Sequence, residues 1–222
     1  MEQLDQITQN IALSMGAAWA GGINLYATIL MIGLMGATGN IQLPPGLSIL
    51  TDPMVLMAAG MMYVTEFIAD KVPGVDSGWD ALHTFIRIPA GAMLAAGAIG
   101  DVTPALELAA AIMGGGLAAT THATKSGSRV LINTSPEPFS NWAASIAEDV
   151  IVVAGLWTAL NHPTLYLGFL VLFMLLMIWL LPRLWRGIKT VCAKVRGIFG
   201  GKKKVLEVGV LNSDQGGDVP HL

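Results

Sequence analysis

The chain has 222 residues, of which 54% are hydrophobic and only 12% are charged. Soluble domains carry about 25% charged residues, so this composition excludes an ordinary soluble globule and a disordered chain. No Asp, Glu, Lys or Arg lies between Gln6 and Thr51, and the mean hydropathy is +0.63. Cys192 is the single cysteine and cannot form an internal disulfide. The composition predicts an integral membrane protein, and no motif calls for a cofactor.

Six apolar runs approach the length that a helix needs to cross a bilayer, which is about 20 residues. They are Ile11–Thr38, Pro53–Ala69, Ile88–Gly100, Pro104–Thr124, Ala143–Leu160 and Pro163–Leu181. Only helices and closed barrels satisfy their backbone in lipid, and these runs are too long for barrel strands. We therefore expect an all-α polytopic membrane helix bundle of about six spans over residues 1–182. Abundant glycine and alanine favour close helix packing and leave a homo-oligomer open.

The basic residues predict an orientation. If six spans are threaded with the C-terminus in the cytoplasm, all twelve Lys and Arg residues fall on the cytoplasmic side. Lys and Arg resist translocation, so this pattern places both termini in the cytoplasm. No Lys or Arg precedes the first apolar run, so a cleaved signal peptide is not expected.

A weak internal repeat is also present. A shift of 93 positions places the first run over the fourth without gaps, so that Gly21–Gly22 meets Gly114–Gly115. With six spans these two runs would enter from opposite sides, which is the arrangement of three-plus-three inverted repeats in transporters. Most matches are Ala or Gly, so chance similarity is the alternative. A competing register pairs Trp79 with Trp142 and cannot hold together with the first.

The first polar stretch follows the second apolar run. Glu66 and Asp70 are one helical turn apart and share a face. After Pro73-Gly74 a new helix is expected, with one stripe formed by Asp76, Asp80, His83 and Arg87. Ionisable groups at the membrane boundary are functional candidates, so Glu66, Asp70, Asp80 and His83 predict a cation site or proton relay. The alternative is a surface loop whose charges pair internally, for example Asp70 or Asp80 with Arg87. Magnesium or calcium ligation matches no known spacing, which leaves any metal undetermined.

A second polar stretch follows the fourth run. Lys125 and Arg129 flank Ser126-Gly-Ser128 and could receive a phosphate, a carboxylate or a lipid headgroup. The alternative is that they only anchor the run on its cytoplasmic side. Gly114–Gly116 precede them and predict a broken helix, because glycine weakens helices. Pro136-Glu-Pro138 suggests a fixed turn that dips back towards the bundle.

Three further polar residues lie near or inside apolar runs. Glu148 resembles Glu66 as a carboxylate near the inner boundary. Asn24 and Tyr26 lie inside the first run and either line a pathway or bond a neighbouring helix.

The pattern changes after Pro182. Over residues 183–204 apolar residues recur at helical spacing, with Lys and Arg on the other faces. This pattern predicts a basic amphipathic helix along the inner leaflet, where anionic lipids attract it. Attachment to the membrane beside a span accounts for the basic residues of this segment, so they are not evidence of nucleic-acid binding and no nucleic acid is expected. Residues 205–222 are expected to form a flexible tail.

Four segments carry a family resemblance: 22–28, 66–77, 79–91 and 133–142. They contain Gly22-Ile-Asn24-Leu-Tyr26, Glu66-Phe-Ile-Ala-Asp70-Lys71-Val-Pro-Gly, Trp79-Asp80-Ala-Leu-His83-Thr-Phe-Ile-Arg87 and Asn133-Thr-Ser-Pro-Glu-Pro-Phe-Ser-Asn-Trp142. From Met15 to Leu160 the chain resembles a bacterial and partly plastid membrane family, domain of unknown function 4126. The resemblance implies a membrane location, in a bacterium the inner (plasma) membrane, and no established activity. It does not extend to the helix after Pro182.

Three functions remain open. In a cation- or proton-linked transporter or channel, Glu66, Asp70 and His83 would form the coupling site, with Glu148 as its counterpart and the path lined by Asn24 and Tyr26. In an enzyme acting on a lipid phosphate, His83 would do acid/base work while Lys125 and Arg129 clamp the phosphate. A non-catalytic membrane scaffold would leave the acids at the lipid boundary without a role.

Overall fold

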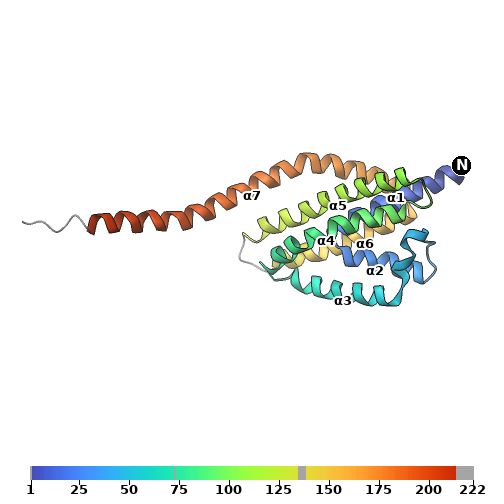
Figure 1. Ribbon diagram of the computed structural model, residues 1–222, viewed down its shortest axis with the longest axis horizontal. Coiled ribbons are helices and arrows are strands. Elements are labelled where there is room, and N and C mark those ends of the chain that lie inside the picture. Colours follow the sequence, from blue (N-terminus) through green and yellow to red (C-terminus); the bar gives the residue numbers. More distant parts are fainter. Residues whose placement is uncertain (1, 73, 135–138, 214–222) are drawn as a thin grey trace, which may run out of the picture.

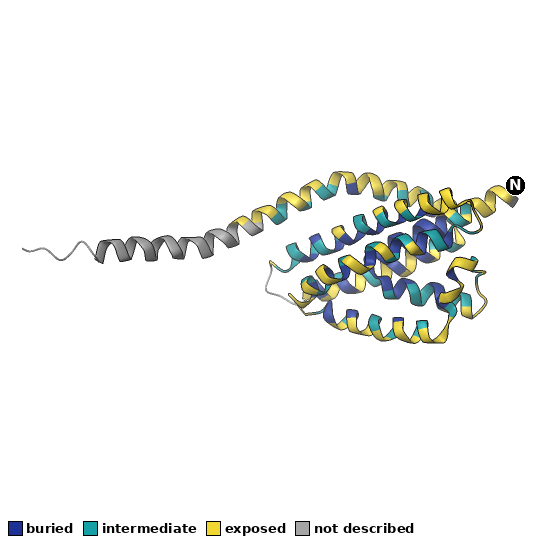
Figure 2. Ribbon diagram, viewed as in Figure 1, coloured by how far each residue is buried: buried dark blue, intermediate teal, exposed yellow. Residues whose placement is uncertain are grey.

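The computed structural model describes residues 2–72, 74–134 and 139–213, and within these ranges its regular elements are all helices, with no strand (Figure 1). Its elements are α1 (Glu2–Ile23), α2 (Leu25–Ala37), the short 3-10 helix η1 (Pro45–Thr51), α3 (Pro53–Ala69), α4 (Val75–Ala98), α5 (Pro104–Ile132), α6 (Phe139–Asn161) and α7 (Pro163–Ser213). The all-α expectation is confirmed. Buried residues concentrate on α1, α4 and α5, whereas α7 is largely exposed over Pro163–Thr190 (Figure 2).

Two of the described helices are long and apolar enough to cross a membrane, α6 and the first part of α7, Pro163–Thr190. A third qualifies if η1 and α3, which meet at an angle of 69°, count as one span. The helices α4 and α5 carry charged residues such as Asp80 and Lys125, so composition alone does not identify them as spans. The count of about six spans stays a prediction.

The first apolar run is divided at Asn24, which has an extended backbone (φ −142°, ψ 100°) between α1 and α2. Its side chain accepts a hydrogen bond of 3.0 Å from the backbone N–H of Ala27 and so caps α2. The 13 residues of α2 rise only about 20 Å, less than the hydrocarbon thickness of about 30 Å.

The chain reverses direction at this break. Asn10 in α1 donates to the carbonyl oxygen of Ile99 just after α4, at 3.1 Å. Beyond the break, Gly33 of α2 packs on η1, and η1 in turn packs against Gly97 of α4 through Gly46. Both ends of this segment therefore lie at the same end of the bundle, so Ile11–Thr38 does not run from one end of the bundle to the other as the single expected crossing would. Residues 11–37 form a helical hairpin with Asn24 at its tip.

This reversal changes the expected placement of the chain ends. The two ends of the hairpin, η1 and the α4–α5 and α6–α7 connections gather at one end of the bundle, called here the close-packed end (Figure 1). The other end, called here the polar end, is formed by the last turns of α3 and α5 and the first turns of α4 and α6. Helix α7 runs back to Gly127 at the polar end. The start of α1 and the end of the bundle part of α7 therefore lie at opposite ends of the bundle. The arrangement does not support both termini on one side.

The register of 93 does not describe an inverted repeat. It overlays α1 on α5, and these helices run in the same direction, because Asn10 lies beside Ile99 and α5 begins nearby at Pro104. The same shift overlays α3 on α6, which run in opposite directions. No single symmetry operation relates both pairs. In the competing register, which pairs Trp79 with Trp142, the hairpin α3–α4 overlays α5–α6 with matching directions.

The glycine triplet does not break α5, which is continuous from Pro104 to Ile132. A Cβ built on Gly114 would lie 2.2 Å from the Cβ of Ala95, and one on Gly115 would lie 3.3 Å from the Cβ of Ala92. The triplet therefore serves close packing between α4 and α5. The expected break is wrong at this position; the one in the structure is at Asn24.

Helix α7 continues without a break through Pro182 to Ser213. It thus contains the segment 183–204 and the first part of the expected tail, while residues 214–222 and the Pro136-Glu-Pro138 turn lie outside the described residues. Attachment of the basic segment to the inner leaflet stays a prediction.

A candidate ion site in the charge cluster

Four helices bring seven charged side chains together at the polar end. We call them the charge cluster: Glu66 from α3, Asp70 directly after it, Asp80 and Arg87 from α4, Lys125 and Arg129 from α5, and Glu148 from α6. The expected stripe on α4 is buried at all four positions. Six of the seven side chains are at most 4% exposed, whereas that of Glu148 is 17% exposed.

Lys125 is the centre of the cluster. Its Nζ lies 2.9 Å from Asp70 Oδ2 and 3.1 Å from Glu66 Oε1. It also lies 3.4 Å from Glu148 Oε2 and 3.8 Å from Asp80 Oδ1. One ammonium group therefore contacts all four carboxylates, which lie far apart in the sequence.

The two arginines bind the periphery of the cluster. Arg87 pairs with Glu66 and, through Nη1 at 3.1 Å, with Asp80 Oδ1. Arg129 makes a two-pronged contact with Glu148, at 2.8 Å from Nη2 and 3.2 Å from Nε. Its Nη1 also donates to the carbonyl oxygens of Asp70 and Asn141, both at 3.1 Å. Such planar, charge-assisted contacts fix the carboxylates in orientation.

The cluster holds more acids than bases. Four carboxylates face three basic groups, which leaves one negative charge uncompensated when all are ionised. Among the described residues, Glu66 Oε2, Asp70 Oδ1 and Asp80 Oδ2 are buried and have no hydrogen-bond partner. An unpaired buried oxygen is costly, so the cluster is chemically suited to accept a proton or a cation.

Two histidines adjoin the cluster. His122 Nδ1 accepts from Arg87 Nη1 at 3.1 Å, so Nε2 carries the ring proton that faces the carbonyl oxygen of Asp80 at 3.1 Å. His83 is one contact further away: its Nδ1 donates to the carbonyl oxygen of Trp79 at 2.9 Å, and its Nε2 lies 3.1 Å from the hydroxyl of Tyr26. The structure thus brings Tyr26 and His83 together but keeps His83 out of the ion pairs.

The hairpin tip reaches a carboxylate that the sequence did not single out. Asn24 Nδ2 donates to Asp149 Oδ1 at 2.9 Å, and Tyr63 of α3 donates to Asp149 Oδ2 at 3.1 Å. Asp149 follows Glu148 directly. The available signal in the sequence was Asn24, because a polar side chain inside an apolar run needs a polar partner on a neighbouring helix. Asn24 is 3% exposed, so the expectation that it faces the bundle holds.

Asp76 has a structural role in this arrangement. It accepts from the backbone N–H of Gly74 at 2.8 Å and from Asn133 Nδ2 at 2.9 Å. Asn133 in turn accepts from Asn141 at 2.7 Å. Asp76 therefore ties the start of α4 to the end of α5 and, through Asn133, to the start of α6.

Neither an anion site nor a metal centre emerges from these residues. Lys125 and Arg129 are buried and direct their donors at carboxylates and carbonyls, not at the surface. Within the described ranges, no group of three or more His, Cys, Asp or Glu side chains is arranged to hold a metal ion.

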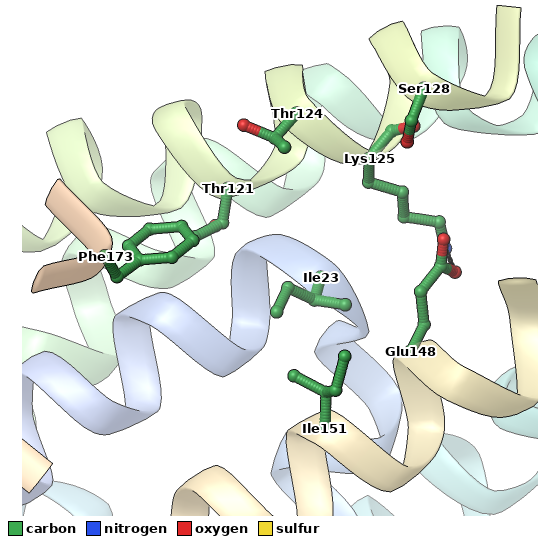
Figure 3. Close-up of a pocket in the computed structure, with 8 residues that line it drawn as sticks. All are labelled: Ile23, Thr121, Thr124, Lys125, Ser128, Glu148, Ile151 and Phe173. Carbon is green, nitrogen blue, oxygen red and sulfur yellow. Dashed lines mark hydrogen bonds and ion pairs between the residues drawn. The ribbon is translucent and has the colours of Figure 1, made fainter. Parts of the chain in front are cut away.

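A pocket of about 150 Å³ reaches the cluster from between α1, α5, α6 and α7 (Figure 3). Lys125 and Glu148 extend towards each other across it, and Ile23 at the end of α1 faces Ile151 of α6. The complete lining is Ile23, Thr121, Thr124, Lys125, Ser128, Glu148, Ile151 and Phe173.

Fold and site together define an all-helical protein that has helices fit to cross a membrane and a buried network of ion pairs at one end. A family model described as Domain of unknown function (DUF4126) matches residues 11–183, and the chain belongs to this family. The resemblance seen in the motifs is confirmed, and the match extends beyond them on both sides. No curated protein and no solved structure matches the chain.

Proposed function

We propose that the protein is a small membrane transporter or channel, linked to a cation or a proton, whose ion-coupling site is the charge cluster. The observation that carries the proposal is the excess of buried carboxylates, with unpaired oxygens on Glu66, Asp70 and Asp80. Burying ionisable groups in a membrane bundle is expensive, and such groups mark ion or proton pathways. Glu66 and Asp80 bind the ion directly, and Arg87 holds both in position.

The helical hairpin supports this proposal, in which it enters the membrane and returns to the same side. Helices that stop inside the membrane place a helix end and free backbone groups at mid-depth, a feature of transporter binding sites. The tip at Asn24 contacts Asp149, and Tyr26 contacts His83. Asn24 and Tyr26 therefore line the path between the cluster and the close-packed end.

For the orientation we propose five crossings, by η1–α3, α4, α5, α6 and α7, together with the re-entrant hairpin. Lys71, Arg87, Lys125, Arg129 and the basic part of α7 belong to the polar half of this arrangement. The positive-inside rule then places the polar end in the cytoplasm and the start of α1 on the opposite side of a bacterial inner membrane. The basic segment 183–204 binds anionic lipid there.

A non-catalytic membrane scaffold is the second candidate. It is favoured by one observation: each charged side chain of the cluster has an ion-pair partner, as a purely structural network would. An enzyme acting on lipid phosphate is less favoured, because Lys125 and Arg129 are already engaged by carboxylates.

The test is flux in proteoliposomes loaded with a pH-sensitive dye, and with ²²Na⁺ in a parallel set. Glu66→Gln keeps an oxygen that accepts from Arg87 but loses the charge, so we expect proton- or sodium-dependent flux to fall to background while the protein stays folded. Glu107→Gln is the matched control, because Glu107 is exposed at the start of α5. Flux in Glu66→Gln equal to the wild type, or no flux in the wild type, would contradict the proposal.

A further inference from the structure

A groove lies between α4 and α7 at the polar end, with α5 as its floor (Figure 1). We call it the α7 groove. Its volume is about 370 Å³, which falls in the range of small-molecule sites, about 300–1,000 Å³. Helix α7 contacts the floor at Gly127, where an added Cβ would lie 3.6 Å from Ile188 Cδ1 and 3.8 Å from Leu184 Cδ1. The residues that line the groove differ from those of the charge cluster, so it is a separate site.

The groove runs from the polar end towards the middle of the bundle. Its outer level is lined by one residue from each helix: Ser77, Val130 and Ile188. Its inner level lies about 10 Å deeper, two helical turns along each helix, at Thr84, Ala123 and Leu181. The candidate span Pro163–Thr190 rises about 42 Å, close to the thickness of a bilayer with its headgroups, about 40–45 Å. In a spanning α7 the outer level therefore lies among the headgroups and the inner level in hydrocarbon.

The inner part of the groove suits a hydrocarbon chain. Its two hydroxyl groups are already engaged, since Thr84 donates to the carbonyl oxygen of Asp80 at 3.0 Å and Ser126 to that of His122 at 2.9 Å. The other side chains at this depth are apolar, such as Leu181. A water molecule needs two to four polar partners, and an empty gap loses dispersion contacts. An acyl chain fills such a surface without either cost.

The rim of the groove carries a hydroxyl donor and a positive charge. Ser77 Oγ accepts from Asn133 Nδ2 at 2.9 Å, and its own proton has no acceptor among the described residues. Lys189 lies one turn beyond Trp185, which lines the groove, and its Nζ is 5.4 Å from the centre of that ring. The carboxylate of Asp76 is fully buried and accepts from Asn133, so it does not oppose an anion here. An ammonium group and a hydroxyl donor at headgroup level favour an anionic phosphate group.

From these features we infer that the α7 groove binds one anionic phospholipid. One acyl chain lies between α4 and α7, and the headgroup phosphate lies at Ser77 and Lys189. The inference specifies a single site within the lipid contact proposed for the basic segment. It does not depend on the proposed transport function, because no residue of the charge cluster takes part.

The experiment measures lipid binding to the full chain without transport. Delipidated protein in detergent is titrated with dioleoyl phosphatidylglycerol or with dioleoyl phosphatidylcholine, and Tm is followed. A ligand that binds the folded state raises Tm in a saturable way. The two lipids have the same chains, but only phosphatidylglycerol carries a net negative charge. We expect its apparent affinity to exceed that of phosphatidylcholine by about fivefold or more, the effect of one basic residue on an anionic lipid.

A charge-matched pair of variants separates this site from a general attraction of the basic segment. Lys189→Gln should weaken phosphatidylglycerol binding by about fivefold. Arg183→Gln removes the same charge from the same helix, but Arg183 lies over the ring of Trp179, outside the groove. Its effect should therefore be less than about twofold, because only screened, long-range attraction is lost.

A second pair tests the acyl chain. Ala123→Phe places a ring at the inner level of the groove and should abolish saturable binding of phosphatidylglycerol. Ala109→Phe adds the same ring at another exposed position of α5, outside the groove, and should leave binding unchanged. If Ala123→Phe does not fold, the pair at Lys189 and Arg183 still decides the question.

Equal affinities for the two lipids would overturn the inference, as would equal phosphatidylglycerol affinities within either pair of variants. The result is separate from that of the flux experiment. Lipid binding as expected, in a protein that shows no flux, would support the groove and overturn only the transport function.

Discussion

The two ends of the bundle are held together by different kinds of contact, although the same helices α4 and α5 contribute to both ends. Towards the close-packed end they meet through small residues such as Gly91, Gly114 and Ala95. Towards the polar end they meet through Asp80, Arg87 and Lys125, which are as deeply buried as the alanines. The first arrangement gains van der Waals contact from short distances, and the second gains charge pairing in a low-dielectric setting.

This difference indicates where the molecule can respond to an ion. A close-packed helix pair has one arrangement, because any added atom clashes. A charge network with unpaired carboxylate oxygens can rearrange its ion pairs when a proton or cation binds, because the net charge of the network then changes. The effects of substitutions on stability should therefore differ between the two ends, both in their physical cause and in their size.

The largest expected effect is at the polar end. Arg87→Leu leaves the buried carboxylates of Glu66 and Asp80 with Lys125 alone, and breaking a buried ion pair costs about 3–5 kcal/mol. We expect the free energy of unfolding in detergent, followed by denaturant titration, to fall by that amount. Arg183→Leu, at an exposed position on α7, serves as the control and should change it by less than about 1 kcal/mol. A loss below about 1 kcal/mol in Arg87→Leu would mean that the ends do not differ as described.

At the close-packed end the expected effect is intermediate. Gly114→Ala brings a Cβ to 2.2 Å from the Cβ of Ala95, so the helices must separate, at a cost of about 1–3 kcal/mol. Gly116→Ala meets nothing within 4 Å and should leave Tm unchanged or slightly higher, because alanine favours the helix. Equal Tm values for the two variants would contradict the close packing of α4 on α5.

The smallest expected effect is at the hairpin tip, which lies between the two ends. Asn24→Ala removes the cap on α2 and the donor to Asp149, and should lower the free energy of unfolding by about 1–2 kcal/mol. Asn40→Ala, which removes an exposed amide, should have no measurable effect. An unaltered stability in Asn24→Ala, measured in the same titration, would exclude the tip as a contact between the hairpin and α6.

Helical periodicity predicted a good part of this site. The spacing of Asp76, Asp80, His83 and Arg87 placed them on one stripe, and all four are buried. The pair Glu66 and Asp70 faces the same interior. Periodicity works here because each of these groups lies within a single continuous helix, so local geometry decides which face it shares.

Contacts between distant segments could not be predicted in this way. Lys125 was interpreted as a membrane anchor or an anion ligand, yet it pairs with Glu66 and Asp70, more than fifty positions away. The helix break was expected at the glycine triplet, whereas close packing keeps that helix intact and the break falls at Asn24. A single extended residue reverses the chain, and hydrophobicity carries no signal of direction.

The position of Lys125 has a consequence for the interpretation of substitutions in this protein. Its one ammonium contacts four acids, so a substitution that neutralises Glu148 alters the electrostatic field at Glu66, Asp70 and Asp80 at the same time. Substitutions at residues that share one partner do not have additive effects. Single variants of the cluster will therefore report on the four acids together, and double-mutant cycles are needed to separate them.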